Sequence, residues 1–360
     1  MIPQSLPNAS YRLGRDAYLS ATWRAAEQRE VFTRRWTLLG DVNALVNPGD
    51  YVAVTVGSAP LVAVRGEDGE LRAFHNLCRH RGMVMLSGSG NVGRTINCFY
   101  HQWRYATDGA LEVVPQRREQ FATIDLGEWG LLPASVDVWE GMVFVHPDPE
   151  APPLSDTLGA LPASIGSHRP GQLVEVAHAR IPAACNWKLL IENHVDVYHL
   201  WYLHAGSLAE FDHTRFQHRQ LDANWVSFEP LRVTAGDGGA LRTGSAPIAH
   251  LDDQDRAGLG AHLLFPNTMM ASSAEFFATY VAEPVAADHT VINLRIRAEA
   301  DADGPALLAS IRSFIDEDVA ACEAVQRGLG SPAFSVGPMA SDHEAAIGEF
   351  HGHLLEAMGV

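Results

Sequence analysis

The chain contains the motifs Cys78-Arg-His80-Arg-Gly82 and Cys98-Phe-Tyr-His101-Gln-Trp103, with 17 residues (81–97) between His80 and Cys98. Each motif offers one thiolate and one imidazole from a short segment, and the two segments match. Thiolates and imidazoles are among the side chains that bind iron and zinc in proteins. The two motifs therefore predict a metal centre in the N-terminal part of the chain.

Two thiolates can bind one iron ion and two imidazoles a second, which is the ligand set of a Rieske [2Fe–2S] cluster. Because neutral imidazoles replace two anionic thiolates, such a cluster has a raised reduction potential and accepts electrons readily. A structural zinc site is the alternative, but zinc fingers place two cysteines in one half and two histidines in the other. We therefore favour a cluster on Cys78, His80, Cys98 and His101.

Around these motifs, residues 36–146 alternate short apolar runs with turn residues, for example Tyr51-Val-Ala-Val-Thr-Val and Gly66-Glu-Asp-Gly. This pattern predicts a small all-β unit. Residues 16–35 have a helical pattern, and the proline-rich segment 146–153 suits a domain boundary.

Beyond residue 153 the sequence mixes strand-like runs with helical patterns. Strands are predicted at 173–179, 225–233, 276–283 and 290–298, and helices at 186–203 and 305–327. The sequence thus predicts an α+β protein. We expect a helical N-terminal segment at 1–35, a β domain at 36–150 and a second domain at 151–360.

The composition excludes several classes of protein. The 360 residues include 26 lysines and arginines and 43 acidic residues. The net charge of −17, with histidine neutral, opposes binding to nucleic acid or to an anionic membrane surface. The N-terminus does not resemble a signal peptide, and four cysteines without one do not predict a disulfide framework. We expect a cytoplasmic protein without a transmembrane helix, and we interpret Cys185 and Cys322 as small buried hydrophobic residues.

The segment Gly88-Ser-Gly90-Asn-Val-Gly93 matches a dinucleotide-binding pattern, but that pattern must open a helix. Here it leads into the strand-like run Arg94-Thr-Ile-Asn, so we interpret it as a flexible turn. Without a nicotinamide or flavin motif, the chain is expected to receive its electrons from another protein.

A second set of polar residues lies in the helix predicted at 186–203. At 100° per residue, Asn193, Asp196 and His199 share one stripe of this helix, and apolar side chains cover the rest of its surface. Such a helix is expected to be buried, and buried carboxylates and imidazoles need partners or a metal. His204 lies about 140° from His199 on an ideal helix. The two can share a metal only if the chain bulges or ends near Leu203.

The helix predicted at 305–327 supplies a carboxylate for the same site. Asp318 lies within about 20° of the centre of its apolar stripe, whereas Asp316 and Glu317 point more than about 100° away and are expected to be nearly neutral to substitution. Two histidines and one carboxylate form the facial triad of non-haem Fe(II) oxygenases, which leaves positions open for O₂. A zinc hydrolase is the rival interpretation, but the His-Glu-x-x-His motif is absent and a cluster in the same chain would have no role.

The two motif sets together, Cys78-x-His80 with Cys98-x-x-His101 and Asn193-x-x-Asp196-x-x-His199-x₄-His204, resemble the catalytic α subunit of Rieske non-haem iron ring-hydroxylating oxygenases. The resemblance covers nearly the whole chain. It implies a Rieske domain followed by a helix-grip catalytic domain, an antiparallel sheet with helices. It also implies a [2Fe–2S] cluster on the first motif set and a mononuclear iron on His199, His204 and Asp318.

The same resemblance implies that Asp196 is a carboxylate bridging the two metal sites. The family works as head-to-tail homotrimers, in which the cluster of one subunit lies beside the iron of the next. Electrons then come from a separate NAD(P)H-dependent flavin or iron–sulfur reductase, with or without a ferredoxin. The segment 318–328 is similar to members that act on small aromatic or quaternary ammonium compounds, some of which have Glu where this chain has Asp196.

The leading hypothesis is a terminal oxygenase that uses O₂ to hydroxylate a small aromatic substrate by mono- or dioxygenation. The alternative is a monooxygenase or demethylase for a quaternary ammonium or an N- or O-methyl compound. An electron-transfer protein that uses only the first domain would leave the second domain and its triad unexplained. A protein with zinc in both sites is a third hypothesis, and colour and metal analysis separate it from the oxygenase. Candidate pocket residues, each also compatible with an ordinary core, are Phe211, Phe216, Leu264, Phe265, Met270 and Phe277, and Glu275 is a candidate for binding a cation.

Overall fold

The strands of the chain belong to two separate units. The computed structural model describes residues 13–232 and 243–360. Gln28–Thr157 form the first unit, and the residues up to Glu27 join Leu158–Val360 in the second. The segment predicted at 1–35 is thus divided between the units after Glu27, and residues 1–12 lie outside the described part.

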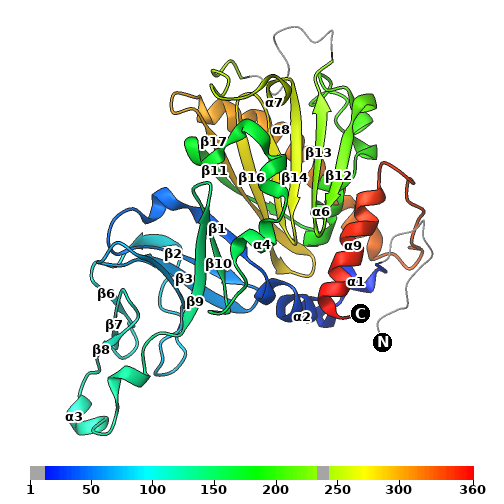
Figure 1. Ribbon diagram of the computed structural model, residues 1–360. Helices are drawn as coiled ribbons and strands as arrows, with labels where there is room; N and C mark the ends of the chain where they lie inside the picture. Colours follow the sequence, from blue (N-terminus) through cyan, green and yellow to red (C-terminus); the bar gives the residue numbers. More distant parts are fainter. Residues whose placement is uncertain (1–12, 233–242) are drawn as a thin grey trace. The chain divides into compact units, whose positions relative to one another are not determined.

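The first unit is built almost entirely from antiparallel strands (Figure 1). One sheet has the order β1-β10-β9-β4-β3-β2-β5, and a smaller one has the order β6-β7-β8. The bounds are β1 (Thr37–Asp41), β2 (Asp50–Val56), β3 (Ala59–Arg65), β4 (Leu71–His75), β5 (Ser89–Asn91), β6 (Thr95–Asn97), β7 (Arg104–Ala106), β8 (Leu111–Val113), β9 (Pro133–Trp139) and β10 (Met142–His146), with the short helix α3 (Arg117–Gln120).

Strand β3 is buried on both of its faces, which explains its continuous apolar run. Val62 and Val64 belong to the apolar cluster that also contains Cys78 and Cys98. Leu61 and Ala63 belong to a second apolar cluster, to which β10 also contributes. Side chains alternate between the two faces of a strand, so one short run supports both cores. The predicted metal motifs are thereby anchored in a packed core.

The glycine-rich segment 88–93 does not open a helix. Ser89–Asn91 form the edge strand β5, and the chain then turns directly into β6. The structure therefore contains no strand-to-helix turn at this segment, which agrees with excluding a dinucleotide site there.

The second unit contains an antiparallel sheet with the order β11-β17-β16-β15-β14-β13-β12. The bounds are β11 (Val174–Ala183), β12 (Gln217–Leu221), β13 (Asn224–Pro230), β14 (Gly258–Leu264), β15 (Thr268–Ser272), β16 (Phe277–Ala286) and β17 (His289–Ala298). Val233, the end of one predicted strand, lies outside the described residues. This sheet with its helices confirms the predicted α+β fold.

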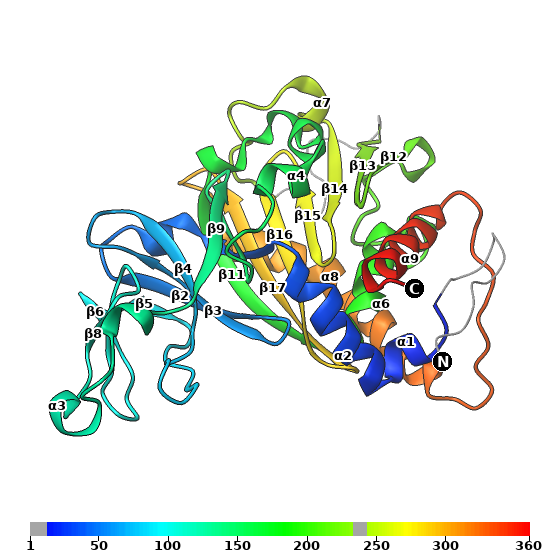
Figure 2. The ribbon, with the colours of Figure 1, turned by 60° about the horizontal axis from the view of Figure 1, so that its bottom comes forward.

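The remaining helices belong to the second unit, except that α2 and α4 each cross the division between the two units. They are α1 (Asp16–Leu19), α2 (Ala21–Glu30), α4 (Leu154–Leu158), α5 (Leu161–Ser164), α6 (Trp187–Val195), α7 (Asp253–Arg256), α8 (Gly304–Leu329) and α9 (Ala345–Met358). Figure 2 shows α1 beside α8 and α9 beside α6, and α8 packs against β11 and β17. In the described residues, no helix is both long and apolar enough to cross a membrane.

The helix predicted at 186–203 is shorter than expected. Helix α6 ends at Val195, because Asp196 adopts an extended backbone conformation (ψ 125°), and residues 198–201 form a separate 3-10 turn. The side chain of Asp196 stabilises this break by accepting the backbone N–H of Tyr198 at 2.6 Å. Local side-chain hydrogen bonding of this kind competes with continuation of a helix.

A buried ion pair fixes the beginning of α6. Lys188 is fully buried, and its Nζ lies 2.5 Å from Oε1 of Glu27 on α2. The indole nitrogens of Trp23 and Trp187 donate to the same carboxylate at 3.0 and 3.1 Å. Burial lowers the pKa of Lys188, and the charge of Glu27 opposes that change. The negative charge of the Glu27 carboxylate and the positive charge of the Lys188 ammonium group compensate each other inside the core.

We expect the change Lys188→Ala to lower the free energy of unfolding by about 3–5 kcal/mol, because it leaves the charge of Glu27 buried without its partner. The double change Lys188→Met with Glu27→Gln should recover most of this loss. Urea unfolding followed by tryptophan fluorescence measures both. Arg180→Ala, which breaks an exposed ion pair with Glu283, is the control and should cost less than about 1 kcal/mol. Equal losses for Lys188→Ala and Arg180→Ala would contradict this account.

Candidate metal centres and active site

The two cysteine–histidine loops of the first unit have the same backbone design. The amide of Cys78 donates to a carbonyl five residues later at 2.8 Å, and that of Cys98 does the same at 2.9 Å. Each cysteine carbonyl accepts an amide four residues later, from Gly82 and Gln102, both at 2.9 Å. Gly82 and Gln102 have positive φ angles of 68° and 59°, which close the two turns. The loops therefore present their ligands as a matched pair.

The side chains of these loops converge. Cys78 and Cys98 are buried and are not joined in a disulfide, and the rings of His80 and His101 have centroids 4.5 Å apart. The ring of Trp103 stacks on His80 at 5.0 Å. Nδ1 of His80 is buried without a hydrogen-bond partner among the described residues. Two close thiols with two close imidazoles, one of them bearing an orphaned nitrogen, fit a two-iron cluster.

The hydroxyl of Tyr105 lies beside this site. Its oxygen is 3.4 Å from Sγ of Cys78 and accepts the amide of Arg79 at 2.9 Å. Burial raises the pKa of Tyr105, so the phenol stays protonated and can donate to the sulfur. Hydrogen bonds to the sulfur ligands are among the factors that set the potential of an iron–sulfur cluster.

We expect Tyr105→Phe to lower the reduction potential of the cluster by about 40 mV, since a hydrogen bond of about 1 kcal/mol to the thiolate favours the reduced form. Spectroelectrochemical titration of the cluster absorbance measures the shift. Tyr51→Phe is the matched control, because that hydroxyl donates to the carbonyl of Ser87 and does not contact a cysteine. An unchanged potential in Tyr105→Phe would show that the hydroxyl does not act on the cluster.

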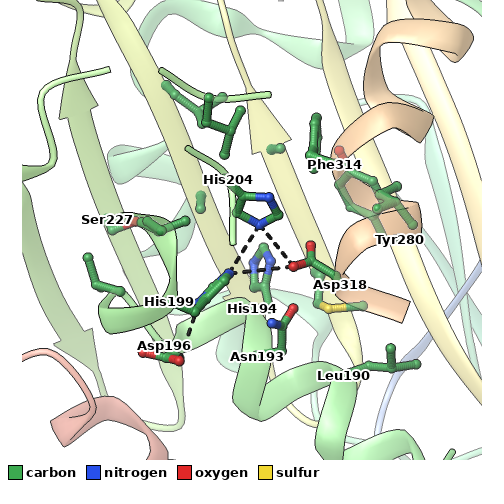
Figure 3. Close-up of a pocket in the computed structure, with 18 of the residues that line it drawn as sticks. Leu190, Asn193, His194, Asp196, His199, His204, Ser227, Tyr280, Phe314 and Asp318 are labelled. Carbon is green, nitrogen blue, oxygen red and sulfur yellow. Dashed lines mark hydrogen bonds and ion pairs between the residues drawn. The ribbon is translucent and has the colours of Figure 1, made fainter. Parts of the chain in front are cut away.

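In the second unit, His199, His204 and Asp318 point toward one another (Figure 3). Nε2 of His199 is 3.2 Å from Nε2 of His204, and Oδ1 of Asp318 is 2.9 Å from the second and 3.5 Å from the first. His199 belongs to the turn after α6, His204 follows that turn, and Asp318 lies on α8. The structure thus brings together the three residues that the sequence singled out.

Because α6 ends at Val195, His199 and His204 can point to one site although they would lie about 140° apart on a continuous helix. The predicted stripe of a continuous helix does not exist beyond that point, so His199 and His204 are placed by a turn and not by helical phase. The amide of Leu203 donates to the carbonyl of His199 at 2.8 Å, and the amide of Val197 donates to the carbonyl of His343 at 3.0 Å. The expected break near Leu203 therefore occurs about two turns of helix earlier.

Carboxylates lie beside the outer nitrogens of both histidines. Oδ2 of Asp196 lies 3.3 Å from Nδ1 of His199. Oε2 of Glu317 lies 2.7 Å from Nδ1 of His204 and accepts the hydroxyl of Ser207 at 2.6 Å. The expectation that the side chain of Glu317 points away from the site is therefore wrong. Helical phase directs its Cβ away from the site, but the long side chain reaches the outer edge of His204.

Electrostatics favour a cation at the centre of this group. Burial alone would lower the pKa of His199, but the carboxylates of Asp196 and Asp318 outweigh it and raise that pKa to about 9. Burial would raise the pKa of Asp318, but the two imidazoles hold it below its usual value. Oδ1 of Asp318 is buried and has no well-aligned hydrogen bond within the described residues, although both Nε2 atoms are near. Two imidazole nitrogens and a carboxylate oxygen that converge on one point, with the oxygen lacking a well-aligned hydrogen bond from any described residue, fit a divalent metal ion.

A cavity of about 110 Å³ opens onto the three convergent residues. Its lining is mainly apolar and comes from α6, the segment between α6 and β12, α8 and the strands β13 to β17. The lining residues are Leu190, Asn193, His194, Asp196, Val197, His199, Leu200, His204, Leu208, Phe216, Trp225, Ser227, Glu229, Leu259, Ala261, Met269, Ala271, Tyr280, Ile292, Phe314, Ile315, Asp318 and Val319.

Of the candidate pocket residues, the structure places only Phe216 in this lining. The others are buried in the core: Phe211, Leu264, Phe265, Met270 and Phe277. Met269 lines the cavity while its neighbour Met270 does not, because successive side chains face opposite sides of a strand. Glu275 accepts the amide and hydroxyl of Thr243, both at 2.8 Å, and lies outside the cavity. Sequence reasoning missed Glu229 and Tyr280.

A two-iron ligand set and a two-histidine, one-carboxylate site in the same chain define an iron-dependent oxygenase. Two family models match the chain: the Rieske [2Fe–2S] domain at residues 35–133 and the catalytic domain of the ring-hydroxylating α subunit at residues 170–359. The chain therefore belongs to the Rieske non-haem iron oxygenases, as a member of the α-subunit family. It is an oxidoreductase whose cofactors are a Rieske [2Fe–2S] cluster and a mononuclear non-haem iron.

Relatives in this family have several activities. The chain is 29% identical to the carnitine monooxygenase oxygenase subunit of Escherichia coli, over 92% of this chain and 89% of that protein. It is 35% identical to the glycine betaine monooxygenase oxygenase subunit of Chromohalobacter salexigens, over 53% of this chain but 43% of the relative. With the benzene 1,2-dioxygenase α subunit of Pseudomonas putida it shares 35% identity over 48% of this chain and 40% of that one.

Solved structures of the family have the same fold. The quaternary ammonium Rieske monooxygenase CntA in complex with L-carnitine matches with a TM-score of 0.82 at 23% identity, covering 99% of this chain and 100% of that one. Naphthalene 1,2-dioxygenase with bound indole matches with a TM-score of 0.78 at 21% identity, covering 99% and 94%.

We expect Glu317→Ala to weaken binding of the mononuclear iron about 10- to 100-fold, because the orienting partner of a histidine ligand is lost. Anaerobic titration of the iron-depleted protein with Fe(II) measures this affinity. Asp316→Ala is the matched control, since Asp316 pairs with Arg312 on the exposed side of the same helix and should have no effect. Identical iron affinities in the two variants would contradict the role of Glu317.

Proposed function

We propose that the chain is the terminal oxygenase of a multicomponent system. Cys78, His80, Cys98 and His101 would hold the cluster that accepts electrons from a separate NAD(P)H-dependent reductase. His199, His204 and Asp318 would hold the mononuclear iron. The observation that carries the proposal is the convergence of two imidazoles and one carboxylate, within 3.5 Å of one another, on the wall of an apolar cavity. This ligand set leaves positions open for O₂.

The protein groups around the iron site have distinct tasks. When bound, the iron activates O₂ for insertion into a carbon–hydrogen bond or an aromatic ring, with electrons from the cluster. Asp196 and Glu317 hold the imidazoles of His199 and His204 in place through their outer nitrogens. The apolar lining excludes bulk water and binds the hydrocarbon part of the substrate.

We propose a small methylated ammonium compound as the substrate, oxidised at a carbon next to nitrogen. A cavity of about 110 Å³ is of the size that holds one benzene-sized molecule. The carboxylate of Glu229 lines it, and no lysine or arginine is among the described lining residues. The names of the carnitine and glycine betaine relatives support this choice.

A small aromatic compound is the second candidate. The cavity walls are dominated by Leu, Ile, Val, Met, Ala and Phe side chains, which would accommodate a ring. The benzene dioxygenase relative supports this candidate over about half of the chain.

Turnover with a reconstituted reductase tests the function. Small methylated ammonium compounds and small arenes are offered separately under ¹⁸O₂, and products are identified by mass. Incorporation of ¹⁸O, or release of formaldehyde from an N-methyl group, is the expected result. A protein with its cluster and its mononuclear iron bound and its cluster reoxidised by O₂, but with no product from either class, would refute the substrate proposal.

We further propose that the active unit is the homotrimer of the family, in a cytoplasmic protein. Aromatic side chains are exposed beside both metal sites. Phe99 and Tyr100 adjoin His101 and are 73% and 55% exposed, and Tyr202, three residues from His199, is 72% exposed. Such residues are enriched in interfaces between proteins. Contact between subunits would bring Asp196 next to His101 of a neighbouring copy.

We expect Asp196→Asn to keep the cluster and most of the mononuclear iron but to lose nearly all turnover. The amide cannot bridge two imidazoles as a carboxylate does, so electron transfer from cluster to iron should fail. Single-turnover kinetics of the pre-reduced enzyme measure reoxidation of the cluster. Asp212→Asn is the matched control, because Asp212 makes the same local turn by accepting the amide of Thr214. Reoxidation of Asp196→Asn at the wild-type rate would refute the bridging role, as would a fully active monomer.

A further inference from the structure

The polar groups on one wall of the cavity lie on a single strand. Trp225, Ser227 and Glu229 occupy alternate positions of β13 and all line the cavity. Alternation along a strand directs these three to the same face. We call them the β13 stripe. Residues from the neighbouring strands β14 and β15 that line the cavity are apolar, so the stripe is the polar part of this side of the sheet.

Glu229 is the charged member of the stripe. It is 5% exposed, and Oε2 accepts Nδ1–H of the buried His213 at 2.7 Å. His213 does not line the cavity, so this hydrogen bond holds the carboxylate from behind. A buried carboxylate is costly unless a positive group compensates it. No described lining residue is a lysine or an arginine.

Aromatic rings accompany this carboxylate. The register pairs Gln217 with Phe228, which places Phe216 next to Glu229. Phe216 and Trp225 both line the cavity, and the ring of His218 lies between them, with centroids 5.2 Å from Phe216 and 6.5 Å from Trp225. Aromatic faces attract cations that have no hydrogen-bond donor, such as methylated ammonium groups.

Two buried donors in the same cavity complete the pattern. The indole nitrogen of Trp225 and the hydroxyl of Tyr280 have no hydrogen-bond partner among the described residues, although both residues are at most 5% exposed. Burial raises the pKa of Tyr280, so its hydroxyl remains a donor. Figure 3 shows Tyr280 across the cavity from Ser227. A ligand oxygen would satisfy these donors.

We propose that the β13 stripe is the specificity-determining site for the substrate, with Glu229 and the aromatic residues Phe216 and Trp225 binding a cationic nitrogen. The substrate is then a small ammonium compound that also carries a hydroxyl or carbonyl oxygen. This inference rests on the proposed function. It assigns substrate selection to β13, whereas the residues that would hold the iron lie on α8 and on the segment after α6.

Charge recognition is tested with two probes of the same shape. Choline carries a quaternary nitrogen, and 3,3-dimethylbutan-1-ol has carbon in its place. Calorimetric titration of the anaerobic holoenzyme measures binding without turnover. We expect choline to bind at least about tenfold more tightly than the neutral alcohol, and Glu229→Gln to remove that preference while leaving affinity for the alcohol unchanged. Glu210→Gln, a buried carboxylate outside the cavity, is the matched control and should keep the preference.

The inference is overturned if the holoenzyme does not prefer choline, including when neither probe binds, or if Glu229→Gln weakens both probes equally. Thermal unfolding and iron content of each variant show that the fold and the iron site are intact. Failure of the proposed function has a different signature, namely a protein that does not bind iron at His199, His204 and Asp318 or whose reduced cluster is not reoxidised by O₂. The two failures are therefore distinguishable.

Discussion

The break in the backbone at Asp196 is the constraint on which the iron site depends. On an unbroken helix, His199 and His204 would point about 140° apart and could not share a ligand. Because α6 ends at Val195, the following turn brings their Nε2 atoms within 3.2 Å. Asp196 contributes twice, since one carboxylate oxygen stabilises the turn and the other lies beside His199.

A turn is less rigid than a helix, and the structure compensates with fixed supports on both sides of the break. The buried pair of Lys188 and Glu27 fixes the start of α6, and Asn186 caps it by accepting the amide of Lys188 at 3.1 Å. Beyond the break, Glu317 binds both His204 and Ser207. Each imidazole thus has one nitrogen toward the carboxylate of Asp318. Its other nitrogen lies beside a second carboxylate, that of Asp196 or Glu317, which favours one ring orientation.

The sequence predicted those features whose residues lie close together along the chain. The cluster motifs could be interpreted from spacing alone, and helical phase placed Asp318 correctly because α8 is continuous from Gly304 to Leu329. The early end of α6 was missed, since no proline or glycine marks it. Glu317 was missed because phase gives the direction of a Cβ and not the reach of a long side chain. Helix α9 was not predicted.

Glu229 could not have been found from the sequence, because its partner His213 and its neighbour Phe216 meet it only through the pairing of β12 with β13.

The position of β13 in the sheet has a functional consequence. Helix α8, which carries Asp318, packs on β11 and β17 at one edge of the sheet, whereas β13 lies next to the other edge. The oxidising centre and the β13 stripe therefore depend on different elements of one sheet. Substitutions on β13 can change which molecule is bound without moving the residues that hold the metal, so relatives with one fold and one iron site can act on unlike substrates.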